Sequence, residues 1–97
     1  MGNSLEVLKG FPKTVRATLG SELYRLQLGA APMDSKPMTT VGRGVKELRA
    51  RDKNNQYRTM YVIKKADGVV ILHVFVKKTQ RTSKQDIAIA KQRLKEI

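Results

Sequence analysis

The chain has 97 residues and no cysteine, with 20 Lys or Arg residues against 8 Asp or Glu residues and a formal net charge of +12. This length predicts one small domain over residues 1–97, and the lack of cysteine excludes disulfides and thiolate metal sites. No apolar run is long enough to span a membrane, so we expect a cytoplasmic protein.

Two helices are predicted at the start of the chain. A short helix can begin at Asn3 or Ser4, either of which can cap it, and Gly10 ends it. A longer helix is predicted for residues 13–28, with Gly29 as its C-terminal stop. Four apolar side chains recur at helical spacing along one face of this longer helix: Val15, Leu19, Leu23 and Leu26.

Residues 30–44 contain two prolines and two glycines and have no hydrophobic period, so we predict a surface connection. A meander of three strands is predicted after it. Residues 69–76 are apolar on both faces, as expected of a central strand. The predicted strands cover residues 45–51, 57–65 and 69–76, with turns at residues 53–55 and 66–68.

A last helix is predicted to begin near Thr82 or Ser83, with Gln85 placed to complete a capping box with Thr82. Two helices, then a meander, then a helix is an α+β pattern. We therefore predict N-terminal helices packed on an antiparallel or mixed sheet, followed by a C-terminal helix. The apolar stripe predicted for that helix consists of Ile87, Ala90, Leu94 and Ile97.

Positive charge is concentrated in the second half of the chain. Residues 1–42 hold five Lys or Arg and three acidic residues, whereas residues 43–97 hold fifteen and five. Such asymmetry indicates a basic surface directed at a polyanion. Nucleic acid is the leading partner, and an anionic membrane or an acidic protein surface is the alternative.

The strand predicted to end at Val76 passes directly into a basic segment, Lys77 to Lys84. Because a buried strand holds its own end in place, Lys77 and Lys78 are candidates for contact with phosphate. Backbone N–H groups at the start of the following helix would add to their charge, with Thr79 and Gln80 beside them. The alternative is a generic basic loop.

Three arginines on the preceding strands are further candidates. Arg49 and Arg51 point to one side of their strand, roughly 6 to 7 Å apart, which is comparable with the phosphate spacing of an extended nucleic acid. The alternative for both is a solvated outer face. Arg58 lies in a strand expected inside the sheet, so it must either face a wet concave surface or pair with Glu47 or Asp52.

His73 is the only histidine, so any acid–base scheme that uses imidazole must use this residue. Its apolar neighbours favour a hydrogen-bonded structural histidine instead. The sequence has no metal-binding cluster and no glycine-rich phosphate loop. RNA cleavage needs neither, because the 2′-hydroxyl is an internal nucleophile that a protein must position while cations stabilise the developing charge.

Four segments together resemble the phage-associated HigB branch of the RelE/ParE toxin superfamily: KELRARD at 46–52, YRTMYV at 57–62, LHVFVKKTQRT at 72–82 and AKQRL at 90–94. The resemblance implies the toxin of a type II toxin–antitoxin module, a metal-independent endoribonuclease that cleaves mRNA on the ribosome. It also implies a helix-turn-helix, HigA-like antitoxin as partner, and no membrane. Members usually open with a β-strand before the first helix, so we expect that strand to be missing or shortened here.

The residues and the resemblance together predict the site. Arg58 matches the active-site arginine of the superfamily, and Lys77 and Lys78 match its basic pair. Two alternatives remain open: a ParE-like inhibitor of DNA gyrase, and a non-catalytic RNA-binding module. The predicted catalytic residues are Arg58, Lys77 and Lys78, and the predicted RNA contacts are Arg49, Arg51, His73, Thr79, Gln80 and Arg81, with no metal and no cofactor.

Overall fold

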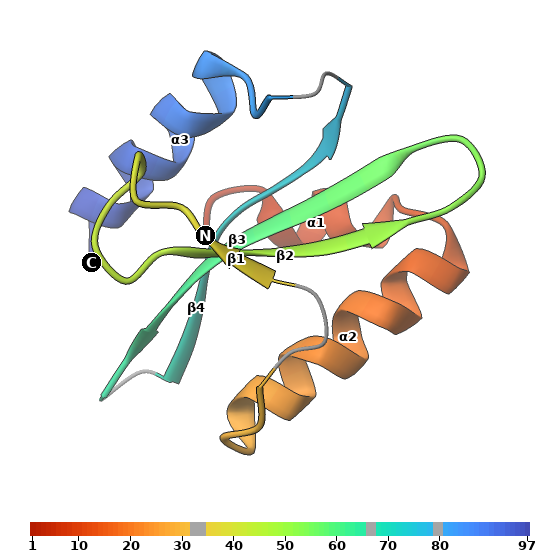
Figure 1. Ribbon diagram of the computed structural model, residues 1–97, viewed down its shortest axis with the longest axis horizontal. Coiled ribbons are helices and arrows are strands. Elements are labelled where there is room, and N and C mark those ends of the chain that lie inside the picture. The colour runs from red at the N-terminus through yellow and green to blue at the C-terminus, as the bar shows by residue number, and fades with distance from the viewer. Residues whose placement is uncertain (32–34, 66–67, 79–80) are drawn as a thin grey trace.

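The computed structural model describes residues 1–31, 35–65, 68–78 and 81–97. The strands form one antiparallel sheet in the order β1-β2-β3-β4 (Figure 1). The predicted α+β class with an antiparallel sheet is confirmed. The elements are α1 (Ser4–Lys9), α2 (Lys13–Gln27), β1 (Ser35–Pro37), β2 (Lys46–Arg51), β3 (Gln56–Lys64), β4 (Gly68–Lys77) and α3 (Lys84–Lys95). No helix in these ranges is long and apolar enough to cross a membrane.

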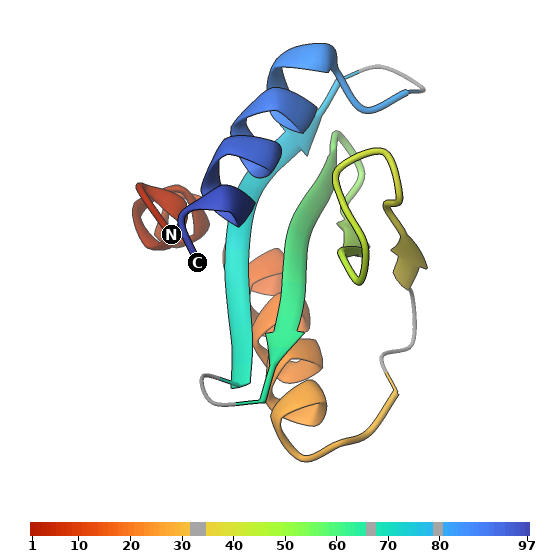
Figure 2. The same ribbon diagram turned by 90° about the vertical axis from the view of Figure 1, so that its left-hand side faces the viewer.

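Helices cover both faces of the sheet, and each face has its own apolar cluster (Figure 2). The α1 and α2 side buries the predicted face of the long helix, because Val15, Leu19 and Leu26 pack on β2, β3 and β4. The α3 side is smaller. Its buried members are Met38, Val41, Val45, Met60, Val62, Leu72, Phe75 and Ala90.

The prediction of a central strand at residues 69–76 is wrong. In the described sheet β4 is an edge strand that pairs with β3. Its apolar character on both sides has another cause, since helices pack against both of its faces. Two of its backbone carbonyls also accept hydrogen bonds: Ile71 O from the Met1 ammonium at 2.6 Å, and Leu72 O from Arg93 Nη1 at 2.9 Å.

In its described residues, the predicted surface connection at residues 30–44 is more ordered than expected. It contains β1, which is only three residues long and too short to produce a detectable hydrophobic period. Met38 and Val41 are buried against the α3 side of the sheet. Gly42 allows this approach, because a Cβ there would collide with the side chain of Leu94.

The C-terminal helix begins one residue later than the predicted capping box requires. Ser83 is its N-cap: its Oγ accepts from the Asp86 N–H at 3.1 Å and donates to Asp86 Oδ2 at 2.6 Å. The helix is therefore capped by Ser83, which is hydrogen-bonded to Asp86, and not by the predicted box of Thr82 and Gln85. Ile97 lies beyond the end of α3 and is exposed, so it does not extend the apolar stripe.

Candidate nucleic-acid interface

The α3 side of the sheet divides into an apolar part and a charged part. Alternate residues of a strand point to the same face. On β3, Met60 and Val62 lie in the apolar cluster with α3, whereas Arg58 continues the same face toward the β2–β3 turn. The helix thus covers one end of this face and leaves the charged end open.

The strand register places at least one cation from each strand on this open end. Lys36 lies opposite Glu47, Arg49 lies opposite Arg58, and Lys77 lies opposite Gln56. Residues directly opposite each other in antiparallel strands share a face. We call the set Lys36, Arg49, Arg58 and Lys77 the cationic row.

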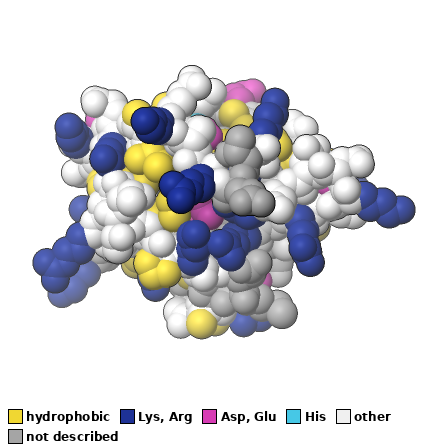
Figure 3. All heavy atoms as spheres, turned by 45° about the horizontal axis from the view of Figure 1, so that its top comes forward, with side chains coloured by type: hydrophobic (Ala, Val, Ile, Leu, Met, Phe, Trp, Pro, Cys, Tyr) yellow, Lys and Arg dark blue, Asp and Glu magenta, His cyan; other side chains and the backbone are white. Residues whose placement is uncertain are grey.

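A broad open hollow of about 1090 Å³ lies along this part of the sheet. Lys and Arg side chains gather across the middle of this side of the molecule (Figure 3). Five of the predicted site residues line the hollow, so the fold brings together cations that three strands supply. The lining consists of Arg49, Ala50, Arg51, Asp52, Lys53, Asn54, Asn55, Gln56, Arg58, Lys77 and Lys78.

Glu47 is a fully buried carboxylate beneath these cations, with 0% of its side chain exposed. Its Oε1 lies 3.2 Å from Arg58 Nε and 3.8 Å from Arg49 Nε, and its Oε2 accepts a hydrogen bond of 3.3 Å from the Thr82 hydroxyl. A buried charge is tolerated only when it is paired. The ion pair that the sequence allowed between Arg58 and Glu47 is therefore present, and it links two arginines to one acid.

Each of the three guanidinium nitrogens of Arg58 has a protein partner. Nη1 donates to the Tyr57 carbonyl at 3.2 Å and Nη2 donates to Gln56 Oε1 at 2.6 Å, in addition to the ion pair at Nε. The residue is 6% exposed and borders the hollow. Its orientation is thus set before any ligand arrives, which lowers the entropic cost of binding a phosphate.

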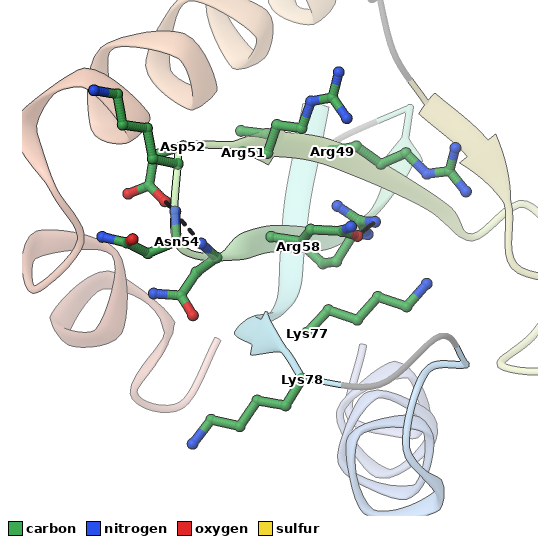
Figure 4. A pocket seen from close by; sticks show the side chains of 11 residues that line it. Arg49, Arg51, Asp52, Asn54, Arg58, Lys77 and Lys78 are labelled. Carbon is green, nitrogen blue, oxygen red and sulfur yellow. Dashed lines mark hydrogen bonds between the residues drawn. The ribbon is translucent and has the colours of Figure 1, made fainter.

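Lys77 and Lys78 extend in opposite directions from the end of β4, with Lys77 on the side of Arg49 and Arg58 (Figure 4). Burial lowers the pKa of Lys77 below its ordinary value, and the nearby Arg58, Lys36 and Arg49 lower that pKa further, against the opposing effect of Glu47. The two lysines therefore differ in place: Lys77 belongs to the cationic row, and Lys78 lies beside it.

We expect Lys77 to lose its proton below the ordinary lysine pKa of 10.5, and Arg58→Met to raise the pKa of Lys77. The reason is that the Arg58 guanidinium disfavours a second positive charge beside it. Because the folded-state pKa is the lower one, the stability of the fold should increase as pH rises through it toward the unfolded value. An NMR titration of the lysine side-chain carbons measures this pKa.

Arg51→Met is the matched control for that titration, since Arg51 lines the hollow but is not among the groups that lower the pKa of Lys77. We expect it to change the Lys77 titration less than Arg58→Met does. Equal titration curves for the Arg58 variant and the wild type would contradict the coupling.

Two other predicted RNA contacts, His73 and Arg81, are not among the residues that line the hollow. His73 is 7% exposed, its Nε2 lies 2.7 Å from Asp86 Oδ1, and its ring stacks on Phe75 with centroids 5.0 Å apart. It does not line the hollow, and this environment is that of a hydrogen-bonded structural histidine. Arg81 lines a smaller neighbouring hollow of about 140 Å³ together with Lys77 and Lys78. Thr79 and Gln80 lie outside the described residues.

Lys36 of the cationic row, and several of the residues that line the hollow, were not predicted as site residues from the sequence. Lys36 was missed because it stands in the segment taken as a connection, and only the pairing of β1 with β2 brings it to this face. The β2–β3 turn was predicted as a turn but not as a part of the site. The sequence did contain a signal for the turn as part of the site, because a turn between two strands that carry cations must lie at the end of the face that those strands share.

The sequence of this chain matches a known protein family. It matches the family model described as phage derived protein Gp49-like (DUF891) over residues 6–95. No curated protein matched the chain. Within the described ranges, no group of three or more His, Cys, Asp or Glu side chains is placed to hold a metal ion. The family match spans almost the whole chain, so this protein belongs to the phage-derived Gp49-like family, which is related to HigB/RelE-type toxins.

Proposed function

We propose that this protein is the toxin of a type II toxin–antitoxin module and that it cleaves mRNA as a metal-independent endoribonuclease. The observation that carries the proposal is the cationic row, which places a Lys or Arg from each of the four strands on one face of the sheet, with Arg49, Arg58 and Lys77 lining an open hollow. Membership of a family related to HigB/RelE-type toxins supports it.

The proposed reaction uses the RNA as its own nucleophile. The 2′-oxygen attacks the adjacent phosphorus and loses its proton, the bond from phosphorus to the 5′-oxygen breaks, and the 5′-oxygen takes up a proton. The products are a 2′,3′-cyclic phosphate and a 5′-hydroxyl. Negative charge accumulates on the phosphoryl oxygens during this step, and preorganised cations stabilise such charge.

Arg58 and Lys77 fit this role best among the described residues. Arg58 has a fixed guanidinium, and guanidinium matches phosphate oxygens in geometry. Lys77 carries a lowered pKa, which brings a lysine closer to the range in which it also exchanges protons. Lys78, Arg49 and Arg51 would hold the flanking phosphates, which positions the RNA without selecting its sequence.

Ribosome-bound mRNA as substrate, a helix-turn-helix antitoxin as inhibitor and action in the cytoplasm complete the proposal. We base these three parts on what the resemblance to HigB-like toxins implies. The formal net charge of +12 suits a ligand as anionic as the ribosome and its mRNA.

Brief induction in bacterial cells, followed by mapping of RNA ends, tests the function. We expect arrested translation and new transcript ends with cyclic phosphate and 5′-hydroxyl groups. Lys77→Ala should reduce these ends by about 10- to 100-fold, because it removes one positioned charge from the transition state. Lys91→Ala, which removes the same charge from an exposed site on α3, should leave them unchanged.

Two outcomes would contradict the proposal. Intact transcripts with induced DNA damage would favour inhibition of gyrase. Steeply salt-dependent RNA binding without any new ends, on free RNA and on ribosomes alike, would favour a binding module without catalysis.

A further inference from the structure

We propose that the β2–β3 turn reads nucleobases, with the side-chain amides of Asn54 and Asn55 forming hydrogen bonds to the base edges of RNA held by the cationic row. This inference rests on the proposed function for its ligand, single-stranded RNA. It assigns to the turn the sequence preference of the site, a property that the cations cannot supply, because phosphate contacts are the same for every sequence.

The turn belongs to the same hollow as the cations. Lys53, Asn54 and Asn55 line it together with Arg58 and Lys77. Asn54 and Asp52 lie at one end of the hollow, whereas the tips of Arg49 and Lys77 lie toward the other (Figure 4). A strand of RNA with its phosphates on the cationic row therefore has its bases within reach of the turn.

The turn is held rigidly by Asp52. Its Oδ1 accepts hydrogen bonds from the backbone N–H groups of Asn55 at 2.8 Å and Asn54 at 2.9 Å, and the Asp52 N–H donates to the Asn55 carbonyl at 3.1 Å. These backbone bonds, that of Asn55 first, lower the pKa of Asp52, so its carboxylate stays charged and keeps accepting them.

Asp52 in turn is tied to the core. Its Oδ2 accepts a hydrogen bond of 3.1 Å from the hydroxyl of Tyr57, which is 3% exposed and packs on Phe11 with ring centroids 4.7 Å apart. The backbone of the turn is thus fixed from the interior. A fixed backbone presents its side chains at low entropic cost, which is the condition for selective contacts.

The chemistry of the turn suits bases rather than phosphates. A carboxamide carries a donor and an acceptor, and so can match the paired donor and acceptor groups on a base edge. Both asparagine side chains are exposed, and neither amide is hydrogen-bonded to another described residue. Single-stranded RNA displays the base edges that such amides recognise.

Gln56 connects the two ends of the hollow. It is the first residue of β3 after the turn, and its Oε1 accepts the 2.6 Å hydrogen bond from Arg58 Nη2. Tyr57 completes the link, because its carbonyl accepts from Arg58 Nη1 and its hydroxyl donates to Asp52 Oδ2, so the turn and the arginine that would stabilise the phosphate belong to one hydrogen-bonded unit. A base seated against the turn would be in a defined position relative to the phosphate.

The test measures binding separately from cleavage. Oligonucleotides about eight nucleotides long, made of 2′-O-methyl adenosine, cytidine or uridine, cannot be cleaved because they lack the nucleophile. We expect their dissociation constants for the wild type, from fluorescence anisotropy at fixed salt, to differ by about 10-fold between the best and the worst base. In Asn54→Ala, Asn55→Ala this difference should fall to about twofold or less, mainly through weaker binding of the best base.

Lys53→Ala is the matched control, because it changes the same turn but removes a charge instead of an amide. It should weaken binding to all three oligonucleotides equally and reduce the slope of affinity against salt by about 1. Asn54→Gly, Asn55→Gly removes both amides with residues that suit a turn and should behave as the alanine variant does. Thermal unfolding of each variant verifies that the fold is retained.

A base preference unchanged in both asparagine variants, or absent from the wild type, would overturn the inference. The proposed function fails separately from it. Wild-type protein that cleaves RNA in cells without base-dependent binding would leave the nuclease standing and remove the role of the turn. Base-dependent binding without new RNA ends would support the role of the turn and contradict the nuclease function.

Discussion

Replacing Arg58 with lysine is expected to lower the rate of RNA cleavage by about 100- to 1000-fold, the loss typical for one preorganised donor at a developing negative charge. The substitution leaves the formal charge of the hollow unchanged, so a lower cleavage rate would come from the lost geometry of the guanidinium and not from lost charge. The guanidinium of Arg58 is fixed by Glu47, the Tyr57 carbonyl and Gln56. A lysine ammonium cannot make these three contacts at once and still face the hollow.

Single-turnover cleavage of a defined mRNA, free and on ribosomes, measures this rate. Arg16→Lys is the matched control, because Arg16 is exposed on α2, which packs on the other side of the sheet. We expect that substitution to leave the rate within about twofold. An Arg58→Lys variant as fast as the wild type would show that Arg58 has a structural role only.

Replacing Glu47 with alanine is expected to destabilise the protein by about 3 to 5 kcal/mol, the usual cost of breaking a buried ion pair from one side. Glu47 is 0% exposed and the Arg58 side chain 7%, so water cannot compensate the guanidinium left behind. The loss is large compared with the whole stability of a small domain, about 5 to 15 kcal/mol. Urea unfolding followed by circular dichroism measures it.

The double variant Glu47→Leu, Arg58→Met shows whether Glu47→Ala loses stability because a charge is left unpaired or because packing is lost. When both charges are removed, the cost of the unpaired one disappears, so the double variant should be more stable than Glu47→Ala. Glu6→Ala, at an exposed position of α1, is the control and should change stability by about 0.5 kcal/mol at most. A Glu47→Ala variant within about 1 kcal/mol of the wild type would contradict this account of the buried pair.

Helix ends and helix faces were predictable because their signals are local. Gly29 has φ of +82° and follows the last turn of α2, as expected of a glycine that ends a helix. Local signals were insufficient at the start of α3, because Thr82 and Ser83 are both suitable N-cap residues. In the structure Asp86 contacts both Ser83 and His73. Tertiary contact selected Ser83.

The sequence alone determined the α+β pattern, the charge of the second half, and five of the residues that line the hollow: Arg49, Arg51, Arg58, Lys77 and Lys78. These depend on composition and on spacing within single elements. The period of two along a strand is sufficient to place alternate cations on one face.

Only the tertiary structure decided which cations meet. The register of β1 brings Lys36 opposite Glu47, and helix α3 covers the apolar end of the same face, so that the charged end stays open. Sequence spacing contains no information on pairing between distant segments, because that pairing is set by the packing of all of them together. The sequence offered Glu47 only as one of two possible partners of Arg58, and the packing of the strands made its buried carboxylate the centre of the site.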